Sequence, residues 1–203
     1  MFADRKDAGR RLAEALWEYK SKNALILALP RGGVPVGFEV AQVLKCPLNT
    51  IVARKIGAPG HSEYALGAIA PGVEILDAPR AELEEVIREE EVEMRRRMEA
   101  YKSGAYSEGA KPETVILVDD GIATGRTARA ALAAVRKKYS SAKIIFAAPV
   151  GAPDSVAELR KYADEVICLE TPSDFDAVGE WYEHFDQTTD NEVIDCLEKA
   201  KAF

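Results

Sequence analysis

The chain has 203 residues, of which 47% are hydrophobic, and its 34 acidic residues outnumber its 27 basic residues to give a net charge of −7. The apolar residues suffice for the core of one α/β domain, and the acidic charge argues against non-specific binding to nucleic acid. The longest apolar runs are only as long as strands, so no signal peptide and no membrane span are expected. Cys46, Cys168 and Cys196 lack metal-ligand spacing, which is typical of buried thiols in the reducing cytoplasm.

Helices and strands are expected to alternate along most of the chain. Residues at helical spacing predict helices over 7–19, 34–44, 81–101, 154–162 and 191–199, the last capped by Asp190. Apolar runs predict strands over 23–30, 48–53, 115–118, 143–149 and 165–169, and an alternating pattern predicts an antiparallel strand over 64–70. A loop is expected at 57–62 and a flexible joint at 104–111.

This alternation indicates an α/β fold with a doubly wound, mostly parallel sheet and helices on both of its faces. The sequence shows no internal repeat and no linker that would separate two domains. We therefore expect residues 1–203 to form a single domain. An apolar surface near the long helix at 81–101 would suit a homodimer.

The most informative stretch is residues 115–132, which read VILVDDGIATGRTARAAL. Asp119 and Asp120 follow a buried strand directly, and the carboxyl ends of strands are where open α/β sheets bind ligands. Residues 123–127 then lead into an Ala-rich helix, whose first N–H groups and dipole attract a phosphate. Gly125 permits close approach of the backbone. The stretch therefore suits a sugar phosphate, with the acids on the ribose hydroxyls and Mg²⁺ on nearby phosphates.

Ordinary turn chemistry explains each of these features when it is taken alone. Asp-Asp-Gly favours turns, and Thr124 or Thr127 suits a helix cap. All of them in a row, directly after a buried strand, favour a binding site. The stretch is neither an ATP P-loop nor a dinucleotide fingerprint, because Gly-Lys-Ser/Thr and G-x-G-x-x-G are both absent from it.

The sequence DDGIATGRT at residues 119–127 resembles the phosphoribosyl pyrophosphate (PRPP) signature of the type I phosphoribosyltransferases. The resemblance implies that Asp119 and Asp120 hold the 2′ and 3′ hydroxyls of ribose. It also implies that these acids help to hold Mg²⁺ indirectly, through water or PRPP. The 5′-phosphate would bind to a set of five residues, namely Ala123, Thr124, Gly125, Arg126 and Thr127.

A second loop, Pro30, Arg31, Gly32 and Gly33, follows the first core strand. Consecutive glycines there suit an anion nest of backbone N–H groups, although an ordinary strand-to-helix turn explains them equally well. In the resembled family a loop at this place binds pyrophosphate and often contains a cis peptide, which here would join Pro30 to Arg31. Arg54 and Lys55 follow the second strand and are expected to face the same crevice as Asp119. There they would bind pyrophosphate, in this subunit or across a dimer; the alternative is an ordinary surface pair. His61 is expected to be simply exposed.

Residues 170–187 read ETPSDFDAVGEWYEHFDQ and begin at the carboxyl edge of the sheet. They resemble the carboxy-terminal hood of hypoxanthine-guanine phosphoribosyltransferases, so we expect a small hood over about residues 170–190. Leu169, Glu170 and Thr171 would read a base through their backbone, and Phe175 would stack on it. The apolar residues that follow Phe175 have the helical spacing of a satellite core; they are Val178, Trp181, Tyr182 and Phe185. Ala123 occupies the position where enzymes for 6-oxopurines usually carry an acid, which argues against that familiar chemistry.

Together these features predict an enzyme that moves the phosphoribosyl group from PRPP to a nitrogenous base and releases pyrophosphate. Its partners would be small molecules, with no nucleic acid and no membrane, in the cytoplasm. The main alternative is a non-catalytic sensor that binds PRPP or a nucleotide with the same fold. A sugar-phosphate hydrolase is a third reading, but no water-activating histidine or metal cluster in the sequence supports it.

Overall fold

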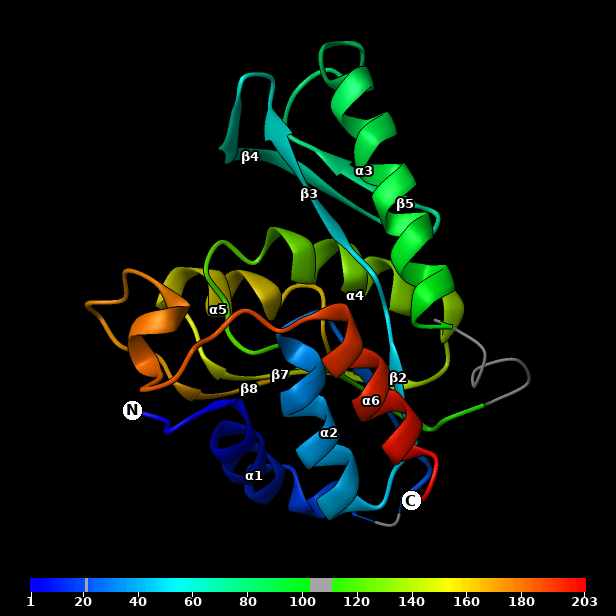
Figure 1. Ribbon diagram of the computed structural model, residues 1–203, viewed down its shortest axis with the longest axis vertical. Helices are drawn as coiled ribbons and strands as arrows, with labels where there is room; N and C mark the ends of the chain where they lie inside the picture. The colour runs from blue at the N-terminus through cyan, green and yellow to red at the C-terminus, as the bar shows by residue number, and fades with distance from the viewer. Residues whose placement is uncertain (21, 103–110) are drawn as a thin grey trace.

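The structure, a computed structural model of the chain, describes residues 1–20, 22–102 and 111–203 (Figure 1). Its α-helices are α1 (Arg5–Ala15), α2 (Gly33–Leu44), α3 (Arg80–Ala100), α4 (Arg126–Lys138), α5 (Pro153–Leu159) and α6 (Asp190–Ala200). Its strands are β1 (Ala24–Ala28), β2 (Leu48–Thr50), β3 (Arg54–Ala58), β4 (His61–Ala70), β5 (Val73–Leu76), β6 (Thr114–Val118), β7 (Lys143–Val150) and β8 (Glu165–Glu170). Most of the joint expected at 104–111 lies outside the described residues.

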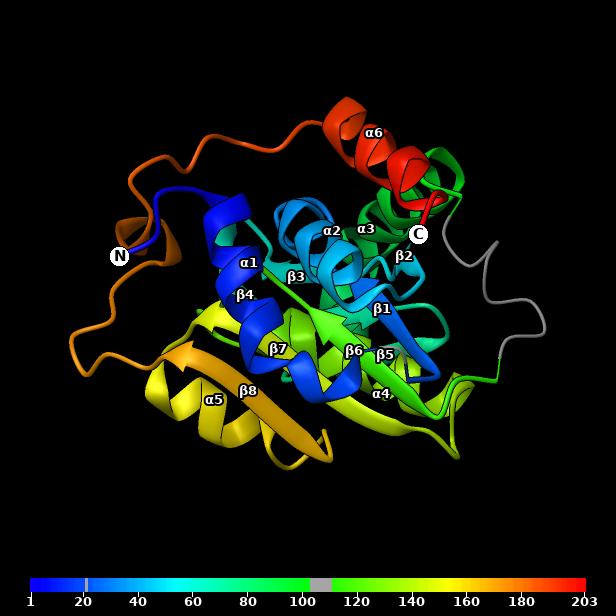
Figure 2. The ribbon, with the colours of Figure 1, turned by 90° about the horizontal axis from the view of Figure 1, so that it is seen from below.

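Five parallel strands form the main sheet in the order β2-β1-β6-β7-β8. Helices α1, α2 and α6 cover one face and α4 and α5 cover the other, as Figure 2 shows. Strand β2, which follows β1 in the sequence, pairs with one edge of β1, and β6 pairs with the other edge. The loops that follow β1 and β6 therefore meet at the carboxyl edge of the sheet, at the switch point where such sheets bind ligands. The expected doubly wound α/β fold is confirmed.

The second sheet is antiparallel, in the order β3-β4-β5, and packs with α3 into an arm that projects from the body (Figure 1). Ile56, Ile69, Leu83 and Ile87 form the core of this arm and are each no more than 1% exposed. The loop expected at 57–62 is wrong, because β3 and β4 run through most of it and leave only Pro59 and Gly60 as a tight turn. The glycines that suggested a loop sit instead at a register shift of the hairpin and at its tip.

The hood, residues 170–190, crosses the end of the sheet between β8 and α6. Its residues Val178, Trp181, Tyr182 and Phe185 pack into a small cluster with Phe2, as the satellite-core interpretation predicted. The cap expected from Asp190 is wrong, because the Thr189 side chain accepts from the N–H of Glu192 in a capping box. None of the described helices is long and apolar enough to span a membrane.

Candidate active site

The acid pair, Asp119 and Asp120, lies just beyond the end of β6 and is half-buried. The N–H of Asp119 donates to the carbonyl of Ala147 at 3.2 Å, and the N–H of Asp120 donates to Asp119 Oδ1 at 2.9 Å. The Tyr182 hydroxyl donates to the carbonyl of Asp120 at 2.6 Å. Hydrogen bonds from neighbouring strands and from the hood therefore fix the backbone of both acids at the edge of the sheet.

The two carboxylates sit in different electrostatic environments. Burial, followed by the negative charge of Asp120, raises the pKa of Asp119 well above its usual value, and the guanidinium of Arg5 opposes this shift only in part. Asp120 Oδ2 accepts from Arg5 Nε at 2.8 Å, so its charge is compensated by a direct partner. Asp119 is the carboxylate that gains more from a ligand that donates hydrogen bonds, such as a sugar diol.

The phosphate loop, residues 123–127, wraps into the first turn of α4. Gly125 precedes the helix with a φ of 67°, a conformation that glycine adopts without a steric penalty. The N–H groups of these five residues have no hydrogen-bond acceptor in the part of the chain that the structure describes. The first paired N–H of the helix belongs to Arg129, which donates to the carbonyl of Gly125 at 2.8 Å. The loop therefore presents a row of unpaired donors at a helix N-terminus, which is a ready anion site.

Contacts from α5 and the arm hold the phosphate loop in place. Ser155 Oγ donates to the carbonyl of Ala123 at 2.6 Å. The Arg126 side chain forms an ion pair with Asp77, which follows β5, and Arg129 lies 3.7 Å from the same carboxylate. Because the Arg126 guanidinium is engaged with the arm, this residue offers the loop its backbone N–H rather than its charge.

The Gly-Gly loop, residues 30–33, packs directly against the acid pair. A Cβ on Gly32 would lie 1.9 Å from Asp120 Oδ2, and a Cβ on Gly33 would lie 2.8 Å from the carbonyl oxygen of Val118. The N–H of Gly33 already donates to the carbonyl of Leu29 at 3.0 Å, whereas those of Arg31 and Gly32 find no acceptor among the described residues. The peptide bond between Pro30 and Arg31 is cis, as the resemblance implied. The glycines thus allow two loops to meet, and the loop keeps two donors for an anion.

A cavity of about 470 Å³ opens between the Gly-Gly loop, Asp120, the arm and the hood, and no residue of the phosphate loop lines it. Its lining comprises Arg5, Arg31, Gly32, Arg54, Arg97, Asp120, Phe185, Gln187 and Thr188. Four of these nine residues are arginines and one is an acid, so the cavity favours anions. Each guanidinium also has a carboxylate neighbour, and the pairs that involve the arm and α6 are Arg54 with Glu90 at 2.6 Å, Arg97 with Glu93 at 2.7 Å and Arg31 with Asp190 at 3.5 Å.

Neighbouring cations and hydroxyls lower the pKa values of two acidic residues near the cavity, Glu93 on α3 and Asp190 on α6. Hydrogen bonds from Arg96 and Arg97 lower the pKa of Glu93 to about 2. The hydroxyl of Tyr101 and the Arg96 guanidinium lower the pKa of Asp190. Glu93 and Asp190 are therefore charged at every physiological pH, and they compete with any bound anion for the arginines of the cavity.

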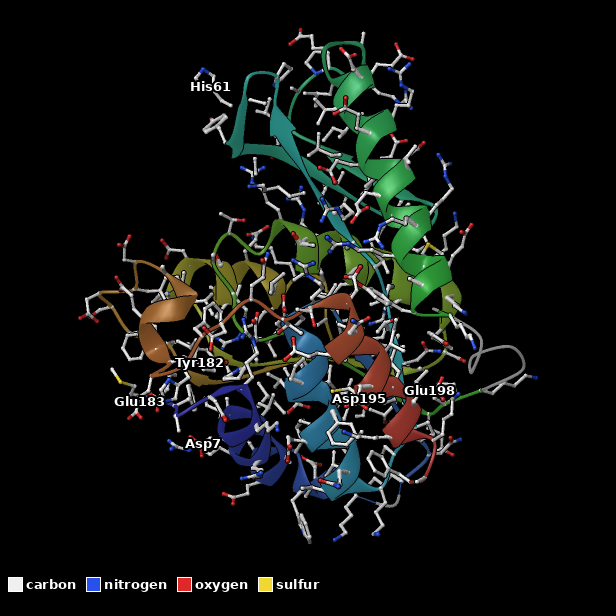
Figure 3. All side chains as sticks on the ribbon, in the orientation of Figure 1. Asp7, His61, Tyr182, Glu183, Asp195 and Glu198 are labelled. Atoms are coloured by element: carbon white, nitrogen blue, oxygen red, sulfur yellow. The ribbon has the colours of Figure 1, made fainter. Side chains whose placement is uncertain are left out.

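Not every predicted residue reaches this cavity. Arg54 does, but Lys55 lines a neighbouring hollow of about 560 Å³ between β3 and α3. His61 lies at the exposed tip of the arm, well away from Tyr182 of the hood (Figure 3). Arg54 and Lys55 therefore line different hollows, because neighbouring residues of a strand point to opposite faces. Their role in binding pyrophosphate stays a prediction.

The residues proposed to read the base lie at the start of the hood. Leu169 is half-buried, Glu170 and Thr171 are exposed, and the carbonyl of Glu170 already accepts from the N–H of Gly151 at 3.0 Å. Phe175 packs against the hood cluster rather than lining the cavity. Phe185 does line it, between Tyr182, at a ring-centroid distance of 4.9 Å, and the guanidinium of Arg5.

Sequence reasoning missed Arg5, Arg97 and Phe185 as site residues. Arg5 precedes the first expected helix, and Arg97 lies within a run of charges that is typical of a solvated helix face. No local pattern distinguishes them, because tertiary contacts alone bring α1, α3 and the hood to the carboxyl edge of the sheet.

Mg²⁺ suits the chemistry of the acid pair, since it prefers carboxylate oxygens and keeps several waters or phosphate oxygens as ligands. The described residues contain no cluster of three or more His, Cys, Asp or Glu that would hold a metal by themselves. The pair therefore fits an ion that is shared with the phosphates of a ligand.

The comparisons agree with this geometry. Residues 3–185 match the model of the phosphoribosyl transferase domain. The chain belongs to the phosphoribosyl transferase family. It is 44% identical over 209 residues to Rv0571c of Mycobacterium tuberculosis, whose name gives phosphoribosyl transferase as a provisional assignment. That match covers 98% of this chain and 47% of the relative, so the chain spans about half the length of the curated proteins it matches.

Solved structures show the same architecture. TT1426 from Thermus thermophilus superposes with a TM-score of 0.78 at 38% identity, and the match covers 98% of each chain. AQ2163 from Aquifex aeolicus has a TM-score of 0.52 at 12% identity, over 95% of this chain and 84% of that one, which shows a shared fold alone.

Proposed function

We propose that this phosphoribosyl transferase uses PRPP, and that it transfers the phosphoribosyl group to a nitrogenous base with release of pyrophosphate. The observation that carries this proposal is the row of unpaired N–H groups at residues 123–127 beside the acid pair. A helix N-terminus next to two carboxylates suits one end of a phosphorylated pentose and its hydroxyls together.

In this reaction a ring nitrogen of the base forms a bond to C1 of the ribose while the bond from C1 to the pyrophosphate oxygen breaks. Positive charge develops on the sugar as the leaving group departs, as in glycoside hydrolysis. Asp119 and Asp120 would accept hydrogen bonds from the ribose hydroxyls and hold the ring in place. No protein nucleophile is required.

The leaving pyrophosphate would lie in the cavity beside Arg31, Arg54 and the free N–H groups of the Gly-Gly loop. Fixed positive charges at this place stabilise negative charge that grows as the bond breaks. Mg²⁺ held with the acid pair would neutralise further phosphate charge. The hood and the arm flank the cavity and would exclude water, which otherwise competes with the base.

Pyrophosphate release tests the proposal. The protein is incubated with PRPP, Mg²⁺ and each member of a panel of purine, pyrimidine and pyridine bases, and the double variant Asp119→Asn with Asp120→Asn serves as the control. Release with one base that the control lacks is expected. The proposed transfer is refuted if no base elicits release above the control.

The alternative, a sensor that binds PRPP without turnover, rests on the same unpaired N–H groups. Tight PRPP binding in a calorimetric titration, combined with no release across the whole panel, would favour it. Because the chain spans about half the length of its curated relatives, the activity of a longer protein is a separate question from the activity of this domain.

A further inference from the structure

The N-terminal segment, residues 2–5, is hydrogen-bonded to the hood. The N–H of Phe2 donates to the carbonyl of Trp181 at 2.8 Å, and the N–H of Glu183 donates to the carbonyl of Phe2 at 2.9 Å. The N–H of His184 donates to the carbonyl of Ala3 at 3.0 Å. Figures 1 and 2 both show the N-terminus beside the hood, so two segments from opposite ends of the sequence form one layer next to the acid pair.

Arg5 joins this layer to the acid pair. Its Nε donates to Asp120 Oδ2 at 2.8 Å, its Nη1 donates to the carbonyl of Asp186 at 2.7 Å, and its Cζ lies 3.9 Å from the centre of the Phe185 ring. The side chains of Arg5 and Asp120 are only 13% and 16% exposed. Solvent therefore screens this ion pair far less than a surface pair, and its geometry is fixed on three sides.

Asp120 depends on Arg5 for its charge compensation. The other groups close to its carboxylate include the Asp119 carboxyl, which offers no positive charge, and the Gly-Gly loop, in which Gly32 leaves no room for a Cβ. A carboxylate that is largely buried is strongly destabilised when its partner is removed. Without Arg5, Asp120 would lose the partner that fixes its orientation beside Asp119.

We propose that Arg5 is a positioning residue that holds Asp120 in the orientation that binds ribose and latches the hood to the acid pair. The positioning half of this inference rests on the proposed function, whereas the latch does not. A guanidinium has five N–H donors, and two of them are used here. The other donors of Arg5 are left for a ligand in the cavity that it lines. Arg5 can therefore hold Asp120 and contact a bound ligand at the same time.

Calorimetric titration with PRPP and Mg²⁺ tests the positioning role in Arg5→Gln, Arg5→Lys and the control Lys6→Gln. Lys6 also lies on α1, but it is exposed and forms no ion pair among the described residues. Arg5→Gln is expected to weaken PRPP binding at least tenfold, Arg5→Lys to restore part of the loss, and Lys6→Gln to leave it unchanged. Wild-type affinity in Arg5→Gln overturns the positioning role.

Rescue by the conservative variant distinguishes positioning from a general loss of structure. Arg5→Gln and Arg5→Lys both lose the guanidinium, but only Arg5→Lys keeps a positive charge that can pair with Asp120. Equal losses of PRPP affinity in the two variants contradict the proposal.

Hydrogen exchange tests the latch independently of PRPP. The N–H groups of Glu183 and His184 bond to the N-terminal segment, so they report on whether the hood stays closed. We expect faster exchange at these residues in Arg5→Gln and unchanged exchange in Lys6→Gln. Unchanged exchange in Arg5→Gln overturns the latch. If the wild-type protein binds no PRPP, the proposed function fails while this result still decides the latch.

Discussion

The hydrogen bond from the Tyr182 hydroxyl to the carbonyl of Asp120, at 2.6 Å, ties the hood to the backbone of the acid pair. Tyr182 is 5% exposed. Tyr182→Phe removes the donor and leaves a carbonyl without this partner, which costs about 1–3 kcal/mol of unfolding free energy. For a protein of this size each kcal/mol lowers the melting temperature by about 2–4 °C. We therefore expect a melting temperature about 2–12 °C below that of the wild type.

Tyr139→Phe is the matched control. Tyr139 is 7% exposed, and within the described residues its hydroxyl is buried without a hydrogen-bond partner. The same chemical change there removes no hydrogen bond, so stability should be unchanged or higher. Thermal unfolding followed by circular dichroism measures both variants. The reasoning is refuted if Tyr182→Phe melts with the wild type, or if the two variants lose stability equally.

Three further substitutions probe the acid pair and the two loops. Asp119→Asn should stabilise the protein, and more so at pH 8 than at pH 5. The pKa of Asp119 is raised by folding, so its cost to stability grows as the pH rises above the pKa of the unfolded chain. An equal gain in melting temperature at both pH values would contradict this. Gly32→Ala should weaken PRPP binding at least tenfold in calorimetry, since its Cβ would lie 1.9 Å from Asp120 Oδ2, and unchanged affinity would argue against the packing described. Gly125→Val forces a β-branched residue to a φ of 67° and should abolish PRPP binding at a cost of about 1–3 kcal/mol in stability. Its control is Gly60→Val at the tip of the arm, where the glycine has a φ of 77°. This variant should cost similar stability without changing PRPP affinity. Equal losses of affinity in the two variants would refute phosphate binding by residues 123–127.

The main sheet could be predicted because four of its five strands contain apolar runs of at least four residues. The strands β1 and β6 are buried along their whole length, which is the pattern of a parallel sheet with both faces covered. The position of the acid pair and of the phosphate loop followed directly from the end of β6. These features depend on residues that are adjacent in the sequence.

The arm and the hood could not be predicted to the same extent, because their structure depends on contacts between distant segments. In the hood, Asp186 meets Arg5 across 181 positions of the sequence, and in the arm Arg54 meets Glu90 across 36. The cap of α6 was misplaced by one residue, since Thr189 and Asp190 are both good capping residues and only the reciprocal bond with Glu192 decides between them.

Calorimetric titration of the wild-type protein with PRPP and Mg²⁺, beside the double variant Asp119→Asn with Asp120→Asn, tests the central claim most directly. The account predicts saturable binding by the wild type and no measurable binding by the variant, with both proteins folded by circular dichroism. Equal affinity of the two proteins for PRPP would contradict it.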